Sequence, residues 1–259
     1  ARIGGIVHPV WAEASSFNFY PDLLFEVSLA DNILIPYLKY TGYTKLNTLQ
    51  EIVAENPFMF EKLYIAPSNF RNYIEGGIRG SLSKSVPYNV SLSFSDVRNM
   101  IFFVNEGMKT DSVFNKFTVI YDNVQIVQPH LELGLLQGKR FDVNLYGDYY
   151  KYNLERIKEA WHKPGYSIGF NFRYNISDKL ITRTDIFYIG KRYAPNYTKK
   201  NEVVALKDII DVNLAFEYRY TSILSAFLKF NNIPALKYNL WQYYPAYRFN
   251  VLAGVTYSF

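Results

Sequence analysis

The chain has 259 residues, no cysteine, and an aromatic content of 18%, with 24 tyrosines and 20 phenylalanines. The lack of cysteine excludes disulfides and thiolate metal sites, and no stretch approaches the ~20 apolar residues of a membrane-spanning helix. The formal charge is +5, but the basic residues are scattered singly, whereas nucleic-acid-binding proteins concentrate them in runs. We therefore expect no nucleic-acid partner.

The first sixty residues predict two strands and a loop. Residues 1–20 carry an irregular strand, because Gly4-Gly5 and Pro9 interrupt its pattern, and the next strand begins near Leu23. The chain does not open with a basic segment leading into an apolar run, so we expect a mature form or a fragment. For residues 47–60 we favour an ordered loop over one or two amphipathic helical turns.

Four later segments, 88–95, 141–150, 166–176 and 210–220, alternate apolar and polar residues with a period of two. Successive side chains of a strand point to opposite faces, so each segment has one apolar and one polar face. The runs are about 10–14 residues long, which suits tilted strands that cross a bilayer. Strands of a soluble β-sandwich, the alternative class, usually have about 5–6 residues.

Short and long connections alternate along the chain. Short turns are predicted at 31–32, 83–87, 138–139, 175–178 and 221–222, and long links at 44–70, 104–116, 153–164, 193–208 and 232–247. Bacterial outer-membrane barrels show this asymmetry, with short periplasmic turns and long external loops. We therefore predict an all-β fold: a transmembrane antiparallel up-and-down β-barrel with about 12 strands visible in one domain over residues 1–259, or the C-terminal part of a larger barrel.

The polar faces of the predicted strands supply side chains that would face the lumen. They would line a wet pore and tune its selectivity, or form an ion-paired network that stiffens neighbouring strands, and we favour the network. Tyr146, Tyr150 and Phe227 face the same way, which indicates a filled lumen. The lumen-facing candidates are Glu75, Arg79, Glu132, Asp142, Asp148, Asn171, Arg173, Arg183, Asp185, Asp211, Glu217, Arg219 and Lys229.

Aromatic residues near the predicted strand ends are typical of the girdle where a barrel meets the membrane interface. Aromatic clusters that bind sugars look similar in sequence, so carbohydrate contact is an alternative. The girdle candidates are Trp161, Tyr188, Tyr193, Trp241, Tyr243, Tyr244 and Tyr247.

The C-terminal residues place Val255, Tyr257 and Phe259 on one face of the last strand. This ending resembles the C-terminal signal by which outer-membrane barrels are recognised for assembly. The resemblance implies the barrel-assembly machinery as a partner, together with outer-membrane lipids.

Six stretches resemble the C-terminal barrel of TonB-dependent receptors. They are Ala160-Trp161-His162-Lys163-Pro164, Ile189-Gly190-Lys191-Arg192-Tyr193, Leu214 to Tyr220, Leu228-Lys229-Phe230-Asn231-Asn232-Ile233, Tyr244-Pro245-Ala246-Tyr247-Arg248-Phe249, and Gly254 to Phe259. The Asn-Asn and Tyr-Pro arrangement is common in Bacteroidetes-type members. The resemblance implies the outer membrane of a Gram-negative bacterium, a large barrel with an N-terminal plug, and energised import of nutrients. No plug domain and no TonB-contacting segment is recognisable here.

A scaffold barrel within a larger outer-membrane complex is the alternative function, with surface lipoproteins or other complex subunits as partners. Catalysis is the third class considered. A nucleophile needs a base within hydrogen-bond reach, and only His8, His130 and His162 are available. Both His130 and His162 are interpreted as lumen or interface residues. No metal-binding motif or cofactor motif is recognised, so we predict no enzyme activity, no metal and no cofactor.

Overall fold

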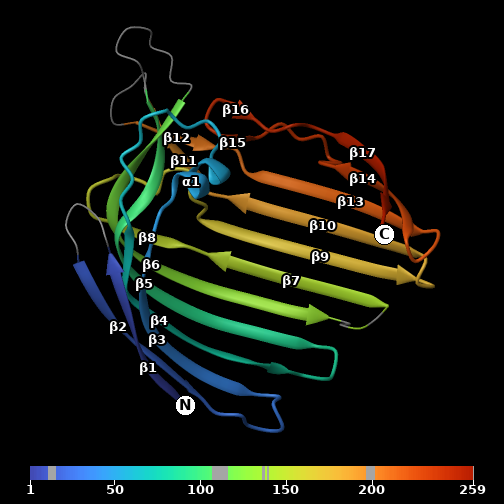
Figure 1. Cartoon of the computed structure of the whole chain (residues 1–259), viewed down its shortest axis with the longest axis horizontal. Helices are drawn as coiled ribbons and strands as arrows, with labels where there is room; N and C mark the ends of the chain where they lie inside the picture. The colour runs from blue at the N-terminus through green and yellow to red at the C-terminus, as the bar shows by residue number, and fades with distance from the viewer. Residues whose placement is uncertain (11–15, 107–115, 136–137, 139, 197–201, 259) are drawn as a thin grey trace.

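The computed structural model describes residues 1–10, 16–106, 116–135, 138, 140–196 and 202–258. Twelve antiparallel strands follow one another in a single sheet, and each pairs with the next along its path (Figure 1). They are β1 (Arg2–Val10), β2 (Ser16–Glu26), β3 (Ile35–Lys45), β4 (Ser68–Ser81), β5 (Pro87–Glu106), β6 (Lys116–Leu135), β7 (Phe141–Tyr149), β9 (Tyr166–Ile176), β10 (Leu180–Gly190), β13 (Ile209–Arg219), β14 (Leu224–Asn231) and β17 (Asn250–Tyr257). A thirteenth strand, β8 (Lys151–Leu154), pairs with β6 alone. The predicted all-β antiparallel fold with about 12 strands is confirmed.

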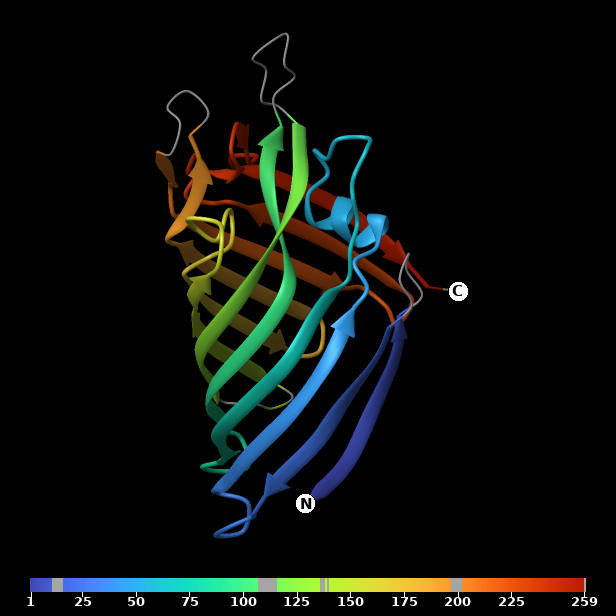
Figure 2. The ribbon, with the colours of Figure 1, turned by 90° about the vertical axis from the view of Figure 1, so that its left-hand side faces the viewer.

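The sheet curls into an incomplete barrel whose two edges are β1 and β17 (Figures 1 and 2). Within the described residues these two edge strands do not pair with each other. In a membrane, backbone groups on an unpaired edge cost several kcal/mol each. The described strands therefore form a section of barrel wall.

Side-chain alternation explains why these segments form strands. In β9, Ile168, Phe170 and Phe172 share one face, on which Ile168 is exposed and the two phenylalanines are half-buried. Asn171 and Arg173 point to the opposite, polar face. A soluble sheet would bury its apolar face, so the exposed apolar face is the one that suits lipid.

Tight turns join the strands at one end of the barrel. Between β9 and β10, Ser177 and Asp178 have φ of 56° and 58°, and Lys179 N donates to Ile176 O at 3.2 Å. Positive φ at both central residues is the type I′ geometry that matches the twist of a two-residue hairpin. Within the described residues, the predicted short turns at 31–32, 83–87, 175–178 and 221–222 lie at this end and the described parts of the long links lie at the other.

The described parts of the long links fold into a cap over their end of the barrel (Figure 2). They contain helix α1 (Leu49–Glu55), the hairpin of β11 (Arg192–Pro195) and β12 (Val203–Leu206), and the pair β15 (Asn239–Trp241) and β16 (Tyr244–Pro245). The ordered loop favoured for 47–60 is wrong, because Thr48 caps a helix by accepting from Glu51 N at 3.2 Å and Ile52 is buried. In the described part of the chain, no helix is long and apolar enough to cross a membrane.

Two hydrophobic clusters form the core, and both lie where the upper parts of β5 and β6 meet the cap. The first joins Ile52 of α1 and Trp241 of β15 to Phe103 and Phe117. The second contains Trp161. The full buried sets are Ile52, Ile101, Phe103, Phe117, Val119 and Trp241, and Val97, Phe102, Val124, Ile126, Ala160 and Trp161.

Candidate functional site: the polar face of the wall and its loop-end cap

Strand register places every predicted lumen-facing residue on the polar face of the sheet. Glu75 stands opposite Ser93, which stands opposite Gln128. The same face continues through Asp148, and it reaches Glu217 on β13 by way of β9 and β10. Whether these residues line a wet pore stays a prediction.

A carboxylate on β4 organises the first part of this face. Glu75 Oε1 accepts from the hydroxyl of Tyr37 at 2.6 Å, and Glu75 Oε2 accepts from Tyr73 at 2.6 Å. Arg79 lies nearer the turn end and pairs with Glu26. A carboxylate with two hydroxyl donors is fixed in orientation, so this part of the wall is stiff.

His130 is the centre of a second polar group, on β6 and β7. Its Nδ1 lies 2.8 Å from Asp148 Oδ1, which also accepts from Gln128 Nε2 at 2.8 Å. Its Nε2 lies 3.8 Å from Glu132 Oε2. This arrangement agrees with a lumen histidine held by two carboxylates.

The remaining candidates are spread over β7 to β14. Asn171 Nδ2 donates to Asp185 at 2.7 Å, and Glu217 pairs with Arg183 at 3.5 Å and with Arg219 at 3.1 Å. The other four candidates lie apart from these pairs. Asp211 accepts from Tyr238 of the cap at 2.6 Å, Asn144 Nδ2 lies 3.5 Å from Asp142, Arg173 stands opposite Arg183, and Lys229 Nζ sits over the Phe227 ring.

The cap is locked by His162, whose main chain has a positive φ of 62°. Its Nδ1 lies 3.0 Å from Phe103 O, so this nitrogen carries the proton, and its Nε2 accepts from Gln242 N at 3.4 Å. The ring packs edge-on against Phe117 and beside Trp241. Burial, together with the nearby cations Arg192 and Lys163, lowers the pKa of His162 to about 4, although its bond to Phe103 acts in the opposite direction.

Arg192 of β11 ties the same loops together. Its guanidinium is buried and donates to the carbonyls of Leu240 at 2.8 Å, Lys207 at 3.0 Å and Asn239 at 3.0 Å. Burial lowers the pKa of Arg192 from its ordinary value, and the negative charge of Asp208 partly opposes that effect. The fork geometry of guanidinium explains how one side chain holds three carbonyls.

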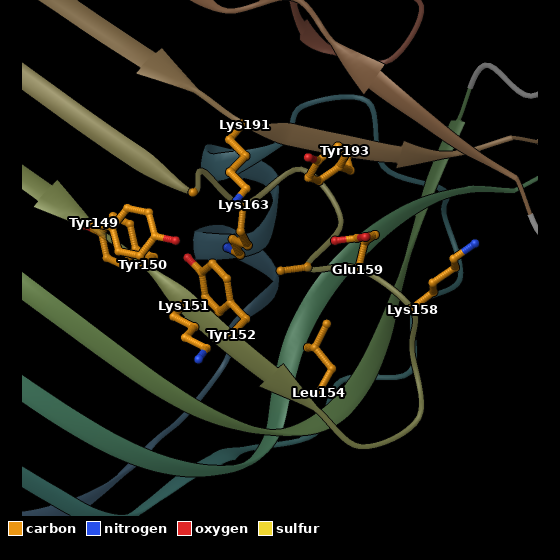
Figure 3. Close-up of a pocket in the computed structure, with 12 residues that line it drawn as sticks. Tyr149, Tyr150, Lys151, Tyr152, Leu154, Lys158, Glu159, Lys163, Lys191 and Tyr193 are labelled. Carbon is orange, nitrogen blue, oxygen red and sulfur yellow. The ribbon is translucent and has the colours of Figure 1, made fainter.

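A pocket of about 160 Å³ lies in the wall beside β8 (Figure 3). The hydroxyls of Tyr150 and Tyr152 point into it, and the side chain of Lys191 extends down from its rim. The sequence predicts an inward Tyr150 and includes Lys191 in a motif, but it does not predict the pocket. Tyr149 of β7 and Lys151 of β8 share the face opposite to Tyr150.

The girdle candidates fall into three groups. Tyr188 lies on the outward face, and Tyr243 and Tyr247 are exposed. Tyr193 and Tyr244 are half-buried against the two clusters. Trp161 and Trp241 are only 8% and 7% exposed, so the girdle prediction is wrong for them: the cap covers the upper strands and turns these rings into core.

At the C-terminus, Val255 and Tyr257 share the outward face of β17 and are 70% and 60% exposed. Phe259 lies outside the described residues. The assembly signal therefore stays a prediction for all three residues.

No protein-family model matches this sequence, and no curated protein matches it. Solved structures do match the fold. The pyoverdine outer membrane receptor FpvA from Pseudomonas aeruginosa PAO1 has a TM-score of 0.66 at 15% identity, over 95% of this chain and 37% of its own. The ferric-catecholate import receptor Fiu from K12 E. coli has a TM-score of 0.65 at 14% identity, over 95% of this chain and 35% of its own.

The copper transporter OprC scores 0.64 at 12% identity, over 96% of this chain and 41% of its own. The chain thus spans about a third of the length of the receptors it matches. At these identities the likeness is one of fold: the sheet matches part of the barrel of TonB-dependent outer-membrane receptors. The matched proteins are receptors and a transporter, not enzymes.

Proposed function

We propose that this chain forms part of the wall of a TonB-dependent receptor-like barrel in the outer membrane of a Gram-negative bacterium, and that it serves nutrient uptake. The observation that carries the proposal is the twelve-strand wall itself, with an exposed apolar face on one side and fixed polar groups on the other. This pair of faces is typical of a membrane barrel, whose outer face contacts lipid and whose inner face is polar.

The matched proteins suggest the substrate class. They are a receptor for pyoverdine, an import receptor for ferric catecholates and a copper transporter. We infer a metal or metal chelate as cargo for the barrel to which this wall belongs. The two unpaired edges support further strands between β17 and β1, because an edge left open in lipid is costly; 22-stranded transporters with a plugged lumen show the scale of such barrels.

Uptake by cells tests this function. Cells with and without the full-length protein would be given radiolabelled ferric pyoverdine, a ferric catecholate or copper, with and without a proton uncoupler. We expect uptake of at least one cargo to depend on the protein and to stop with the uncoupler. Equal uptake of all three without the protein would overturn the proposal.

A scaffold barrel is the second candidate, and one observation favours it. The cap end is filled by two hydrophobic clusters and by the buried His162 and Arg192, so this end is packed and not open. A scaffold would pass no ions in a planar bilayer and would co-purify with lipoproteins or other complex subunits. A transporter, once its plug is released, conducts.

Two finer assignments belong to the same proposal. The Bacteroidetes-type resemblance rests on Asn231-Asn232 and Tyr244-Pro245 alone. Recognition by the barrel-assembly machinery rests on the aromatic ending of β17, and removal of the last three residues would reduce the amount of assembled protein in the membrane.

A further inference from the structure

The wall has a notch beside β8. Strand β8 continues β7 in the same register against β6, but β9 begins only at Tyr166, opposite Tyr149. The second edge of β8 thus pairs with no strand in the described part of the chain. Segment 155–165 folds back beside it, where Tyr150 N donates to Gly165 O and the Tyr152 hydroxyl to Pro164 O. The pocket of about 160 Å³ occupies this notch.

The notch lies at the level where the wall leaves the apolar part of the membrane. Tyr149, Tyr166 and Tyr188 share the outward face: Tyr188 stands level with the exposed Ile168, and the pair Tyr149 and Tyr166 lies closer to the cap. The hydroxyls of Tyr166 and Tyr188 both donate to Asp208 of the cap, at 3.0 and 2.9 Å. Outward tyrosines mark the headgroup level of a membrane barrel, so the notch opens among lipid headgroups.

The side chains around the notch favour an anion. Four lysines line it, against the single carboxylate of Glu159. Lys163 is already paired with Glu55 at 2.7 Å. Lys151 lies on the outward face, and Lys191 Nζ lies 5.7 Å from the ring centre of the outward Tyr149. Among the described residues, no carboxylate forms an ion pair with Lys151 or Lys191.

Below the notch, the outward face carries a glycine between two apolar side chains. Gly147 lies two residues below Tyr149 and stands between Leu131 and Ile168. A Cβ added there would make only ordinary contacts, with Ser167 O at 3.8 Å and Ile168 Cγ1 at 3.9 Å. An acyl chain can lie over this glycine between two apolar side chains.

We propose that the notch is a headgroup site for a phosphorylated membrane lipid in the leaflet on the long-loop side. Lys151 and Lys191 contact the phosphate oxygens at the outward rim of the notch, and one acyl chain lies over Gly147. The inference rests on the membrane setting of the proposed function but not on transport.

Native mass spectrometry of the full-length protein in a neutral detergent tests the site. The probes are phosphatidic acid, phosphatidylcholine and inorganic phosphate. We expect retained phosphatidic acid, with binding weakened at least about tenfold in the double variant Lys151→Gln, Lys191→Gln, since each lysine near a headgroup contributes on the order of 1 kcal/mol. The matched control is Lys84→Gln, Lys179→Gln, which removes the same charge from exposed lysines in the short turns.

Three results would overturn the site: equal weakening by both double variants, no preference for phosphatidic acid over phosphatidylcholine, or competition by inorganic phosphate as strong as by the lipid. Heat-modified gel mobility of each variant shows whether the barrel is folded. Uptake that persists while lipid binding is lost would separate this site from the transport function.

Discussion

Nε2 of His162 accepts the backbone N–H of Gln242 at 3.4 Å and so joins two cap loops that are 80 residues apart. The opposite ring nitrogen faces Phe103 O on β5. One neutral imidazole therefore connects two loops and a strand, and its bond to Gln242 depends on an unprotonated Nε2. Two cations, Arg192 and Lys163, disfavour a second positive charge there.

Acid should loosen the cap through His162. The unfolded pKa is about 6.5 and the folded one is about 4, so the unfolded state binds the proton first. Stability is complete above about pH 6.5 and falls as the pH drops toward about 4, by up to roughly 3 kcal/mol. This loss of stability is measured by hydrogen exchange of the Gln242 amide at pH 7 and at pH 5, after correction for the intrinsic exchange rates. In His162→Asn this pH dependence should vanish, and an unchanged slope would count against the assignment.

Arg192→Met should open the cap without unfolding the wall. The change keeps much of the side-chain volume but leaves the carbonyls of Leu240, Lys207 and Asn239 without their donor. We expect a cost of about 3 kcal/mol, because hydrogen bonds to charged groups contribute on the order of 1.5–3 kcal/mol. Limited proteolysis would show new cuts within 232–249. Arg248→Met, which removes one exposed bond to Ala235, is the control and should leave the cleavage pattern as it is.

Asp122→Ala should release the segment that follows β8. The Asp122 carboxylate is fully buried and accepts from the N–H groups of Asn123, Arg156 and Ile157 at 2.9–3.0 Å. The substitution leaves three N–H donors without their acceptor. We expect each donor that stays buried to cost about 1–3 kcal/mol of stability, and each donor that water reaches to cost less. Faster hydrogen exchange at Arg156 and Ile157 is the readout. Asp122→Asn keeps one acceptor oxygen and should show an intermediate effect; equal protection in both variants and wild type would refute this role.

Gly169→Ala should destabilise the wall, whereas Gly147→Ala should not. Gly169 stands opposite Tyr146 on the polar face, and an added Cβ would overlap the Tyr146 ring. Overpacking of this kind costs about 1–3 kcal/mol. Gly147 lies on the neighbouring register position with only ordinary contacts around it. Urea unfolding of the two variants compares them directly, and equal midpoints would show that Tyr146 moves freely.

The sequence predicts the wall well because alternation is a local property. In β9, the apolar and polar sets could be read from residues 166–176 alone, and the register places them as expected. Turn chemistry is equally local, as at Ser177 and Asp178. These two signals suffice for strand order when each strand pairs with the next.

The cap could not be predicted in the same way. Its structure depends on contacts between distant segments, such as Ile52 with Trp241, which leave no periodic trace. Above the membrane level the inner face also changes character, since Val124 and Ile126 are buried apolar residues on the face that carries Gln128 and His130 below. Polar residues therefore do not mark the inner face at this level. The girdle prediction for Trp161 and Trp241 rested on their position near strand ends, which does not reveal that the cap buries them.

Strands β5 and β6 have 20 residues each, whereas about 9–11 residues suffice to cross a bilayer. In the proposed membrane setting, at roughly 3.4 Å per residue and a tilt of about 45°, the surplus lifts the cap roughly 20 Å above the hydrocarbon core. The short turns give the other end no comparable height. A molecule that approaches from the cap side therefore meets protein well before it meets the membrane surface, and an antibody fragment raised against the cap should reach it on intact cells without touching the lipid.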